Sequence, residues 1–432
     1  MFVSDCLGIN EKGHLTIGGK DTVSLASKYG TPLMVFDEDS IRANMRHFRD
    51  SIDKYYDGNG MALYASKAFC CKEMCRIADS EGLGLDVVSG GEIYTALAAG
   101  FPAERMFFHG NNKTDEEIRY ALKNGVGRFI VDNPEELRRL DTAAGELGIC
   151  QKISLRIKPG IDAHTHEFIK TGQIDSKFGF AIETGEAMEC VKLAIGFENV
   201  ELVGLHCHIG SQVFEVDPFV LAAKVMMRFI ADIWVQFGRK IKELNLGGGF
   251  GIKYSVDDNP LPLGGYMEPV SAAIKDAAKE YGVDIPYILL EPGRSVVGAE
   301  GITLYKVGSV KTIPGVRTYV SVDGGMSDNP RYILYQSEYT VLVADRAGEE
   351  RNMTVTLAGK CCESGDLIQE HTKTQEVKAG DIIAVLTTGA YCYSMASNYN
   401  RIPRPEVLLV KDGKARTIIK RETYEQVCIN DI

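Results

Sequence analysis

Tryptophan is almost missing from this chain, which has one Trp among 432 residues, and long apolar runs are missing altogether. No apolar run approaches the length that a membrane span needs. The N-terminus also lacks the basic stretch followed by an apolar one that marks a secretory signal. We therefore expect a cytoplasmic protein that has no membrane partner.

An excess of basic side chains is also lacking. The chain has 48 Lys and Arg residues against 59 Asp and Glu residues, so its net charge is -11. A general nucleic-acid binder needs a basic face for phosphates, and the composition argues against that class. A small anionic ligand stays possible, because a few local arginines are enough to bind one.

Cysteine pairs with the spacing of a metal or redox motif are absent. The eleven cysteines are odd in number and include no CxxC pair. Cys70-Cys71 and Cys361-Cys362 are adjacent in sequence, which is a poor geometry for a mutual disulfide. We interpret most of the cysteines as small, reduced core residues, with Cys362 as the exception.

The chain is long enough for two domains, and the first of them shows strands alternating with helices. A helical pattern begins at Asp217-Pro218, and Asn133-Pro134 predicts the start of another helix. Eight such units predict a (β/α)8 TIM-like barrel, with an open doubly wound sheet as the alternative. The eight strand-like runs span residues 61–65, 83–88, 105–109, 127–131, 152–157, 201–205, 241–246 and 286–290.

After Arg294 the runs become short and β-branched with turns between them, which is typical of an antiparallel sheet. We predict strand-like segments there at residues 302–310, 317–322, 339–343, 353–357, 381–386 and 406–410. The predicted domains are N-terminal strands in 1–30, the barrel in 31–294 and a mostly antiparallel β domain in 295–432 that includes the N-terminal strands.

Polar residues follow several of the predicted barrel strands, at the end where active sites of such barrels form. A lysine there can make a Schiff base with a carbonyl cofactor, and a glycine run followed by an arginine can bind phosphate. Each feature alone has an ordinary explanation, as a surface lysine or a flexible turn. The residues are Lys67, Asp86, His208, Gly247, Gly248, Gly249, Glu291, Gly293 and Arg294.

His206 and His208 are two residues apart and could hold a metal if they face one side of a strand. No obvious third and fourth ligands accompany them in the sequence, so we predict no metal site. A metal-dependent barrel hydrolase is the corresponding alternative function.

Taken together, these motifs resemble the fold-type III pyridoxal-phosphate decarboxylases, the group that acts on ornithine, arginine and diaminopimelate. The similarity to the diaminopimelate branch is carried by His166-Glu-Phe-Ile-Lys-Thr-Gly172, by Ser176-Lys-Phe-Gly179 and by Cys362-Glu363-Ser-Gly-Asp366. Phe69 departs from the pattern, because the family commonly has asparagine two residues after the lysine.

The resemblance implies a role for each matching residue. Lys67 is the expected Schiff-base lysine and Cys362 the expected proton donor, and Glu291 would pair with the pyridine nitrogen. The implied cofactor contacts are Lys67, Asp86, His208, Ser211, Gly247, Gly248, Gly249, Glu291, Gly293, Arg294 and Tyr391. The implied substrate contacts are Arg294, Arg331, Tyr335, Glu363 and Tyr391.

The implied reaction is the loss of CO2 from meso-2,6-diaminopimelate to give L-lysine, in a homodimer whose active sites are shared across subunits. Glu363 and Arg331 suit a substrate end that carries both an ammonium and a carboxylate. A decarboxylase of ornithine, arginine or another basic amino acid is the alternative within this group. A catalytically inactive homologue is a weaker one, because Lys67 and Cys362 are both present.

Overall fold

The computed structural model describes residues 2–161 and 176–432, so the motif from His166 to Gly172 lies outside the described residues. The chain forms two compact units. The first, here called the β unit, comprises Met1–Ala43, Ile252–Asn259 and Arg294–Ile432. The second, the barrel unit, comprises Asn44–Gly251 and Pro260–Gly293.

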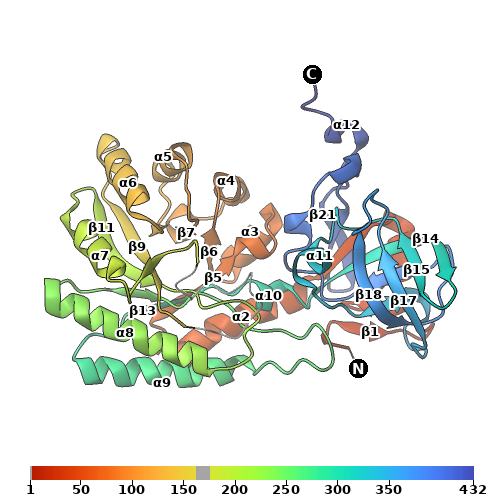
Figure 1. Cartoon of the computed structure of the whole chain (residues 1–432), viewed down its shortest axis with the longest axis horizontal. Helices are drawn as coiled ribbons and strands as arrows, with labels where there is room; N and C mark the ends of the chain where they lie inside the picture. Colours follow the sequence, from red (N-terminus) through yellow and green to blue (C-terminus); the bar gives the residue numbers. More distant parts are fainter. Residues whose placement is uncertain (1, 162–175) are drawn as a thin grey trace. The chain divides into compact units, whose positions relative to one another are not determined.

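Eight parallel strands close into a barrel, as the sequence predicts (Figure 1). Each strand pairs with the next in chain order, and the last pairs with the first, so the sheet has no open edge. The strands are β5 (Gly60–Ala65), β6 (Gly84–Val87), β7 (Met106–Phe108), β8 (Arg128–Val131), β9 (Gln151–Lys158), β11 (Val200–His206), β12 (Glu243–Asn245) and β13 (Tyr287–Leu290). A short β10 (Phe180–Ala181) pairs with β9.

The barrel strands are apolar because helices cover their outer face and side chains fill the inside. Leu63, Phe107, Ile130 and Leu289 come from four different strands and form one buried cluster. Polar side chains are thereby confined largely to the strand ends, which is where the predicted site residues occur.

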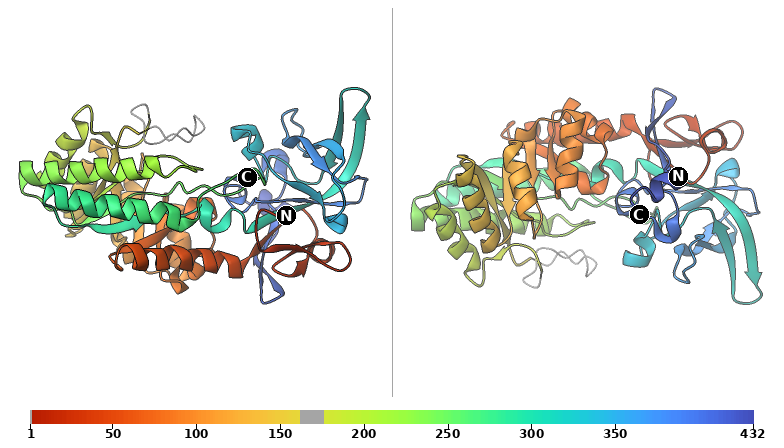
Figure 2. Two further views of the ribbon diagram at one scale, coloured as in Figure 1. Left: turned by 90° about the horizontal axis from the view of Figure 1, so that it is seen from below. Right: turned by 90° about the horizontal axis from the view of Figure 1, so that it is seen from above.

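Helices surround the barrel, and their starts follow the sequence signals. Asn133 caps its helix by accepting a hydrogen bond from the Glu136 N–H at 2.8 Å. The two longest helices, α8 and α9, pack side by side (Figure 2). The helices are α2 (Glu38–Tyr55, which begins in the β unit), α3 (Lys72–Ser80), α4 (Gly90–Ala99), α5 (Asp115–Lys123), α6 (Pro134–Glu146), α7 (Glu186–Gly196), α8 (Asp217–Phe237) and α9 (Leu263–Tyr281).

The β unit contains a large sheet in which most pairings are antiparallel, as predicted. Two pairings, β15–β17 and β4–β20, are parallel. The sheet consists of β4 (Leu33–Asp37), β14 (Gly301–Ile313), β15 (Arg317–Val322), β16 (Val341–Val343), β17 (Met353–Ala358), β18 (Leu367–Thr374), β19 (Ile382–Val385), β20 (Glu406–Lys411) and β21 (Lys414–Ile419). Its helices are α1 (Thr22–Tyr29), α10 (Arg294–Val297), α11 (Arg331–Tyr335) and α12 (Tyr424–Val427).

The N-terminal region differs from the prediction in one respect. The predicted barrel range of 31–294 includes β4, but β4 lies between β14 and β20 in the sheet of the β unit. Its five residues are all buried, so its apolar character is that of any central strand. The three strands before it, β1 (Leu7–Ile9), β2 (Leu15–Ile17) and β3 (Lys20–Asp21), form a small sheet of their own that packs on the same core.

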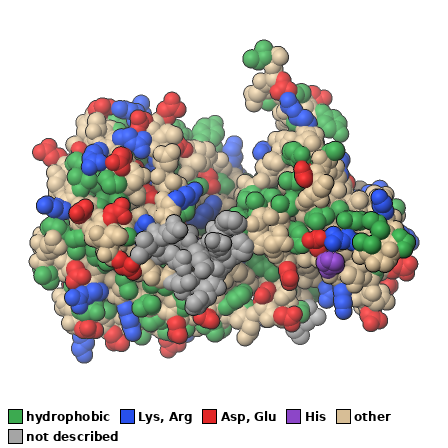
Figure 3. Space-filling view, in the orientation of Figure 1, with side chains coloured by type: hydrophobic (Ala, Val, Ile, Leu, Met, Phe, Trp, Pro, Cys, Tyr) green, Lys and Arg blue, Asp and Glu red, His purple; other side chains and the backbone are tan. Residues whose placement is uncertain are grey.

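Acidic and basic side chains are mixed over the described part of the face drawn in Figure 3. None of the helices in the described ranges is both long and apolar enough to cross a membrane.

Candidate active site

Lys67 lies just beyond the carboxyl end of β5, in a short 3-10 turn formed by Ser66–Ala68. Its ammonium donates a hydrogen bond to Oδ2 of Asp86, from the neighbouring strand β6. Asp86 is fully buried, whereas the Lys67 side chain is 40% exposed. A buried carboxylate needs a cation beside it, and the partly exposed Lys67 side chain supplies that charge.

The loop after Lys67 is fixed by its neighbours. The Tyr64 hydroxyl donates a hydrogen bond of 2.8 Å to the Phe69 carbonyl, and the Phe69 side chain is fully buried. Phe69 therefore anchors the loop through its backbone and its apolar ring.

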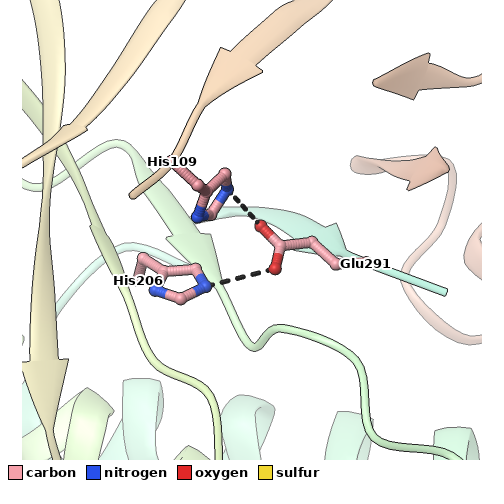
Figure 4. Close-up of side chains that lie close together, drawn as sticks. All are labelled: His109, His206 and Glu291. Atoms are coloured by element: carbon pink, nitrogen blue, oxygen red, sulfur yellow. Dashed lines mark hydrogen bonds and ion pairs between the residues drawn. The ribbon is translucent and has the colours of Figure 1, made fainter. Parts of the chain in front are cut away.

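Glu291, directly after β13, is buried and surrounded by nitrogen atoms (Figure 4). Its Oε1 accepts from Asn245 Nδ2 at 2.7 Å and lies 2.8 Å from His109 Nε2, while Oε2 lies 3.2 Å from His206 Nε2. Burial alone would raise the pKa of Glu291. The charges and hydrogen bonds of His109 and His206 outweigh it and hold that pKa well below the usual range. Glu291 is thus an ionised carboxylate inside the barrel mouth.

His208 lies in the loop after β11, which ends at His206. Its Nδ1 accepts a hydrogen bond from the Gly248 N–H at 3.3 Å. Burial, followed by the positive charge of Arg156, lowers the pKa of His208 well below its ordinary value. The ring is therefore neutral, which suits a flat surface for stacking rather than a charge for pairing.

The glycine run after β12 is tightly packed. A Cβ on Gly247 would lie 2.6 Å from the Cys207 carbonyl oxygen, and one on Gly248 would lie 2.2 Å from the Glu291 carbonyl oxygen. Gly249 has φ of 105°, a conformation that favours glycine. No larger residue fits there, and the backbone of this loop is drawn close to the neighbouring loops that carry His208 and Glu291.

Gly293 is also required by close packing. A Cβ there would lie 2.9 Å from the Ala65 side chain, at the end of β5. Within the barrel unit, the strand-end positions of Lys67, Asp86, His208 and Glu291 therefore converge on one mouth, with the glycine loops between them.

Arg156 and Asp132 form another buried charge pair in the barrel, with Nε and Oδ2 4.0 Å apart. Burial lowers the pKa of Arg156, and its guanidinium lies 4.3 Å from the centre of the Phe178 ring. Asp132 also accepts a hydrogen bond from the Gly179 N–H at 2.7 Å. The Ser176–Gly179 motif is thus attached to the barrel through these two side chains.

A separate group of predicted residues comes together within the β unit. The Arg294 guanidinium lies 4.9 Å from the centre of the Tyr391 ring, and the Arg331 guanidinium lies 5.5 Å from that of Tyr335 and 5.8 Å from that of Tyr391. Tyr254 lies between the two arginines, within 5.7 Å of both. Tyr391 has φ of 63°, a strained conformation for a residue with a side chain, and such strain often marks functional sites.

Arg331 is buried but sparsely hydrogen-bonded. It is 6% exposed, and its Nη2 donates to the Ser337 hydroxyl at 3.0 Å. Its Nε has no hydrogen-bond partner among the described residues. A buried guanidinium with an unused donor suits an anionic ligand.

Cys362 and Glu363 lie elsewhere in the β unit, on an exposed turn after β17. Asp366 fixes this turn by accepting hydrogen bonds from the backbone N–H groups of Met326 at 2.6 Å and Cys361 at 2.7 Å. Both predicted side chains are thereby held in a defined turn and face outwards.

Comparisons with known proteins identify the family of this chain. A family model described as "Pyridoxal-dependent decarboxylase, pyridoxal binding domain" matches residues 38–298. Diaminopimelate decarboxylase of Bacillus subtilis (strain 168) is 50% identical over 432 residues, covering 100% of this chain and 98% of that enzyme. The enzyme of the same name from Staphylococcus aureus (strain COL) is 47% identical, covering 98% of each chain. This chain belongs to the diaminopimelate decarboxylase family.

A solved structure of a family member points the same way. The diaminopimelate decarboxylase from M. jannaschii in co-complex with L-lysine has a TM-score of 0.91 and 35% identity, covering 100% of this chain and 99% of that one. The fold predicted from the sequence, a barrel with a β domain, is therefore the fold of the diaminopimelate decarboxylase family.

The residues present fit the pyridoxal phosphate that the family uses. The barrel mouth offers an amine, a buried ionised carboxylate and a neutral imidazole. Asp86 Oδ1 is buried and has no hydrogen-bond partner among the described residues. This oxygen can therefore still accept a hydrogen bond from a bound group.

Sequence reasoning missed three polar residues of this family member's barrel mouth: His109, Arg156 and Asn245. His109 directly follows β7, so the strand-end rule that selected Lys67 also applied to it. Asn245 is the last residue of β12 and met the same rule. Arg156 lies inside β9, where nothing in the sequence distinguishes an inward-facing arginine from an outward-facing one.

Proposed function

We propose that this protein catalyses the pyridoxal-phosphate-dependent decarboxylation of meso-2,6-diaminopimelate to L-lysine and CO2, the last step of lysine biosynthesis. One observation carries the proposal: the Lys67–Asp86 pair at the mouth of a barrel, in a chain 50% identical over its full length to a diaminopimelate decarboxylase. A lysine amine placed beside a buried carboxylate is poised for covalent chemistry with a carbonyl group.

At the cofactor end, each barrel residue has a distinct task. Pyridoxal phosphate, when bound, supplies an aldehyde for the amine and a ring that accepts the electron pair left by the departing CO2. The amine of Lys67 would hold the cofactor through its aldehyde. Glu291 presents a negative charge to the ring nitrogen and so keeps a proton there. His208 contributes a flat, uncharged surface.

The phosphate contacts of the proposal are the backbone of the glycine run and two further groups, Ser211 and Arg294. Consecutive glycines let the backbone of this loop approach an anion closely, and Arg294 adds a charged fork. Gly293 precedes that arginine in the same loop. Tyr391, whose ring lies beside the Arg294 guanidinium, is proposed to contact both cofactor and substrate.

At the substrate end, the proposal assigns a partner to each distal charge. Arg331, helped by the Tyr335 hydroxyl, binds the carboxylate, and Glu363 binds the ammonium. An unpaired charge in a desolvated site costs several kcal/mol, so both partners are needed. Cys362 is the proposed acid that returns a proton to the carbon that lost CO2.

Domain roles and assembly complete the proposal. The barrel carries the cofactor, and the β domain supplies Cys362 and Glu363 to the active site of a second subunit in a homodimer. This arrangement is supported by the family resemblance and by the exposure of the Cys362 turn. A cytoplasmic location also stays a prediction from the sequence.

The experiment that tests the function measures CO2 release from a panel of amino acids by the purified protein with pyridoxal phosphate. The panel contains meso-diaminopimelate, lysine, ornithine and arginine. We expect meso-diaminopimelate to be preferred by roughly four orders of magnitude in kcat/KM, because a site built around polar partners rejects analogues that lack the matching groups. Preference for ornithine, arginine or lysine would instead support the related decarboxylase activities.

A further inference from the structure

His109 occupies a position between two buried carboxylates. It directly follows β7 and is 3% exposed. Its Nε2 lies 2.8 Å from Oε1 of Glu291 (Figure 4). The same nitrogen lies 3.7 Å from Oδ1 of Asp86. In the proposed function these carboxylates serve the ring nitrogen and the lysine amine, so one ring nitrogen of His109 faces both.

The loop that carries His109 is unusually well fixed. The His109 N–H donates to the Val87 carbonyl at 2.8 Å. Four residues later, the ammonium of Lys113 is 2% exposed and donates to the Gly110 carbonyl at 2.9 Å, the Ile130 carbonyl at 2.8 Å and Glu136 Oε1 at 2.8 Å. All three donors of that ammonium are used inside the protein. These hydrogen bonds fix the loop that carries His109, as a positioned side chain requires.

The other side of Glu291 is held just as closely. Asn245 donates to the same Oε1, and its own Oδ1 accepts from the Gly247 N–H at 2.9 Å. His206 contacts Oε2, and the rings of His109 and His206 meet edge to face with centres 4.9 Å apart. Three nitrogen groups thus fix both the direction and the negative charge of one carboxylate.

We propose that His109 is a positioning residue for the cofactor site: its Nε2, within ion-pair distance of Glu291, keeps that carboxylate ionised and aimed. This inference rests on the proposed function, in which Glu291 serves the ring nitrogen. Loss of the donor lets Glu291 turn or take up a proton. Glu291 then binds the cofactor ring more weakly, although His109 itself need not touch the substrate.

The test compares two substitutions at this position. His109→Gln keeps an N–H donor near the place of Nε2, whereas His109→Leu keeps the bulk and removes the donor. His47→Leu, at an exposed position of α2, is the matched control. For each purified protein we would measure the pyridoxal phosphate dissociation constant by equilibrium dialysis, the visible absorption spectrum, the melting temperature, and kcat and KM for meso-diaminopimelate.

We expect His109→Leu to bind pyridoxal phosphate roughly ten- to a hundredfold more weakly, the range for losing a hydrogen bond to a charged group. Its kcat should fall by a similar factor with KM nearly unchanged, and its visible band should shift. His109→Gln should recover most of each loss, and His47→Leu should match wild type.

Three outcomes would overturn the inference. In the first, folded His109→Leu keeps wild-type cofactor affinity and spectrum. In the second, His109→Leu and His109→Gln lose cofactor affinity equally, which would indicate that His109 acts through packing rather than through its polar contact with Glu291. In the third, apoprotein dialysed against Zn²⁺ binds one equivalent through His109, His206 and Glu291, whose ligand atoms lie within 4.8 Å of one another, while cofactor binding is unaffected. If wild type itself fails to bind pyridoxal phosphate, the proposed function fails instead.

Discussion

At the scale of single residues, Arg331 offers the sharpest test of substrate choice. It is buried, its Nε has no partner among the described residues, and the proposal assigns it to the distal carboxylate. Arg331→Leu should lower kcat/KM for meso-diaminopimelate at least a hundredfold while lysine, which lacks that carboxylate, is affected far less. Steady-state CO2 release with both substrates measures the change in preference.

Arg351→Leu is the control for this prediction, because Arg351 is an exposed arginine of the same unit. It should behave like wild type with both substrates. If Arg331→Leu leaves turnover of meso-diaminopimelate untouched, or reduces the turnover of both substrates equally, Arg331 does not select the carboxylate.

Asp328 provides a pH-dependent test of the β unit. Burial, with a contribution from the charges of Asp366 and Asp323, raises its pKa from 3.8 to about 7. Between pH 3.8 and about 7, the folded chain therefore keeps a proton on Asp328 that the unfolded chain has released. The contribution of Asp328 to stability should fall by about 1.4 kcal/mol per pH unit as pH rises from 4 to 7.

Asp328→Asn removes this titration. The free energy of unfolding in urea, measured at several pH values, should fall less steeply between pH 4 and 7 for the variant than for wild type. The control Asp412→Asn, in an exposed turn, should keep the wild-type slope. Equal slopes for Asp328→Asn and wild type would show that Asp328 titrates normally.

Some residues of the barrel mouth could be predicted from their position at the ends of strands, and others could not. Lys67, Asp86 and Glu291 were predictable because a charged residue at the carboxyl end of an apolar strand is conspicuous. His109 has no functional signal in the sequence beyond its place at the end of a strand, and only its contact with Glu291 in three dimensions gives it a role. Cys362 and Glu363 were chosen through the family resemblance, and no local pattern indicates what they touch.

At the scale of secondary-structure elements, the buried pair Lys113–Glu136 joins the start of α5 to the start of α6. Both side chains are at most 1% exposed, and burial raises the pKa of Glu136. Removing one member of a buried ion pair leaves the other uncompensated. Lys113→Ala should therefore lower the free energy of unfolding by about 3–5 kcal/mol.

The control is Lys123→Ala, at the exposed end of α5, which should change stability by less than about 0.5 kcal/mol. Replacing both members, as in Lys113→Met with Glu136→Leu, should recover much of the loss in thermal or urea unfolding. A single variant as stable as wild type would mean that the pair does not brace these loops.

Elements were predictable where burial imposes a pattern. The eight barrel strands read as apolar runs because both their faces are covered. β18 and β21 were not predicted, since they carry charged residues along exposed faces and lack an apolar run. β4 was misplaced because a buried strand reads alike in a barrel and in a β sheet, and only its partners β14 and β20 distinguish the two.

At the scale of the whole molecule, the chain enters the β unit, leaves it for the barrel and returns to it. The short segment Ile252–Asn259, which carries Tyr254, belongs to the β unit although it interrupts the barrel sequence. The sequence gives no sign that this segment belongs to the β unit, because eight residues are too few to show a pattern of their own. Only the three-dimensional contacts of Ile252–Asn259 assign it to the β unit.

Shared active sites are the main prediction at this scale. Lys67→Ala and Cys362→Ala should each be inactive alone. After mixing and subunit exchange, activity should return to roughly a quarter of the wild-type value per site, because mixed dimers contain one intact site. Exchange is verified independently with tagged subunits, and its occurrence without recovered activity would indicate sites formed within one chain.

The central claim is that Lys67 bonds covalently to pyridoxal phosphate. The most direct measurement is to load the purified protein with the cofactor, reduce it with borohydride, digest it and locate the modified residue by mass spectrometry. We predict one pyridoxyl group, on the peptide that contains Lys67, and none in Lys67→Ala. Modification of a different lysine in the wild-type protein, or none after full loading, would contradict the account.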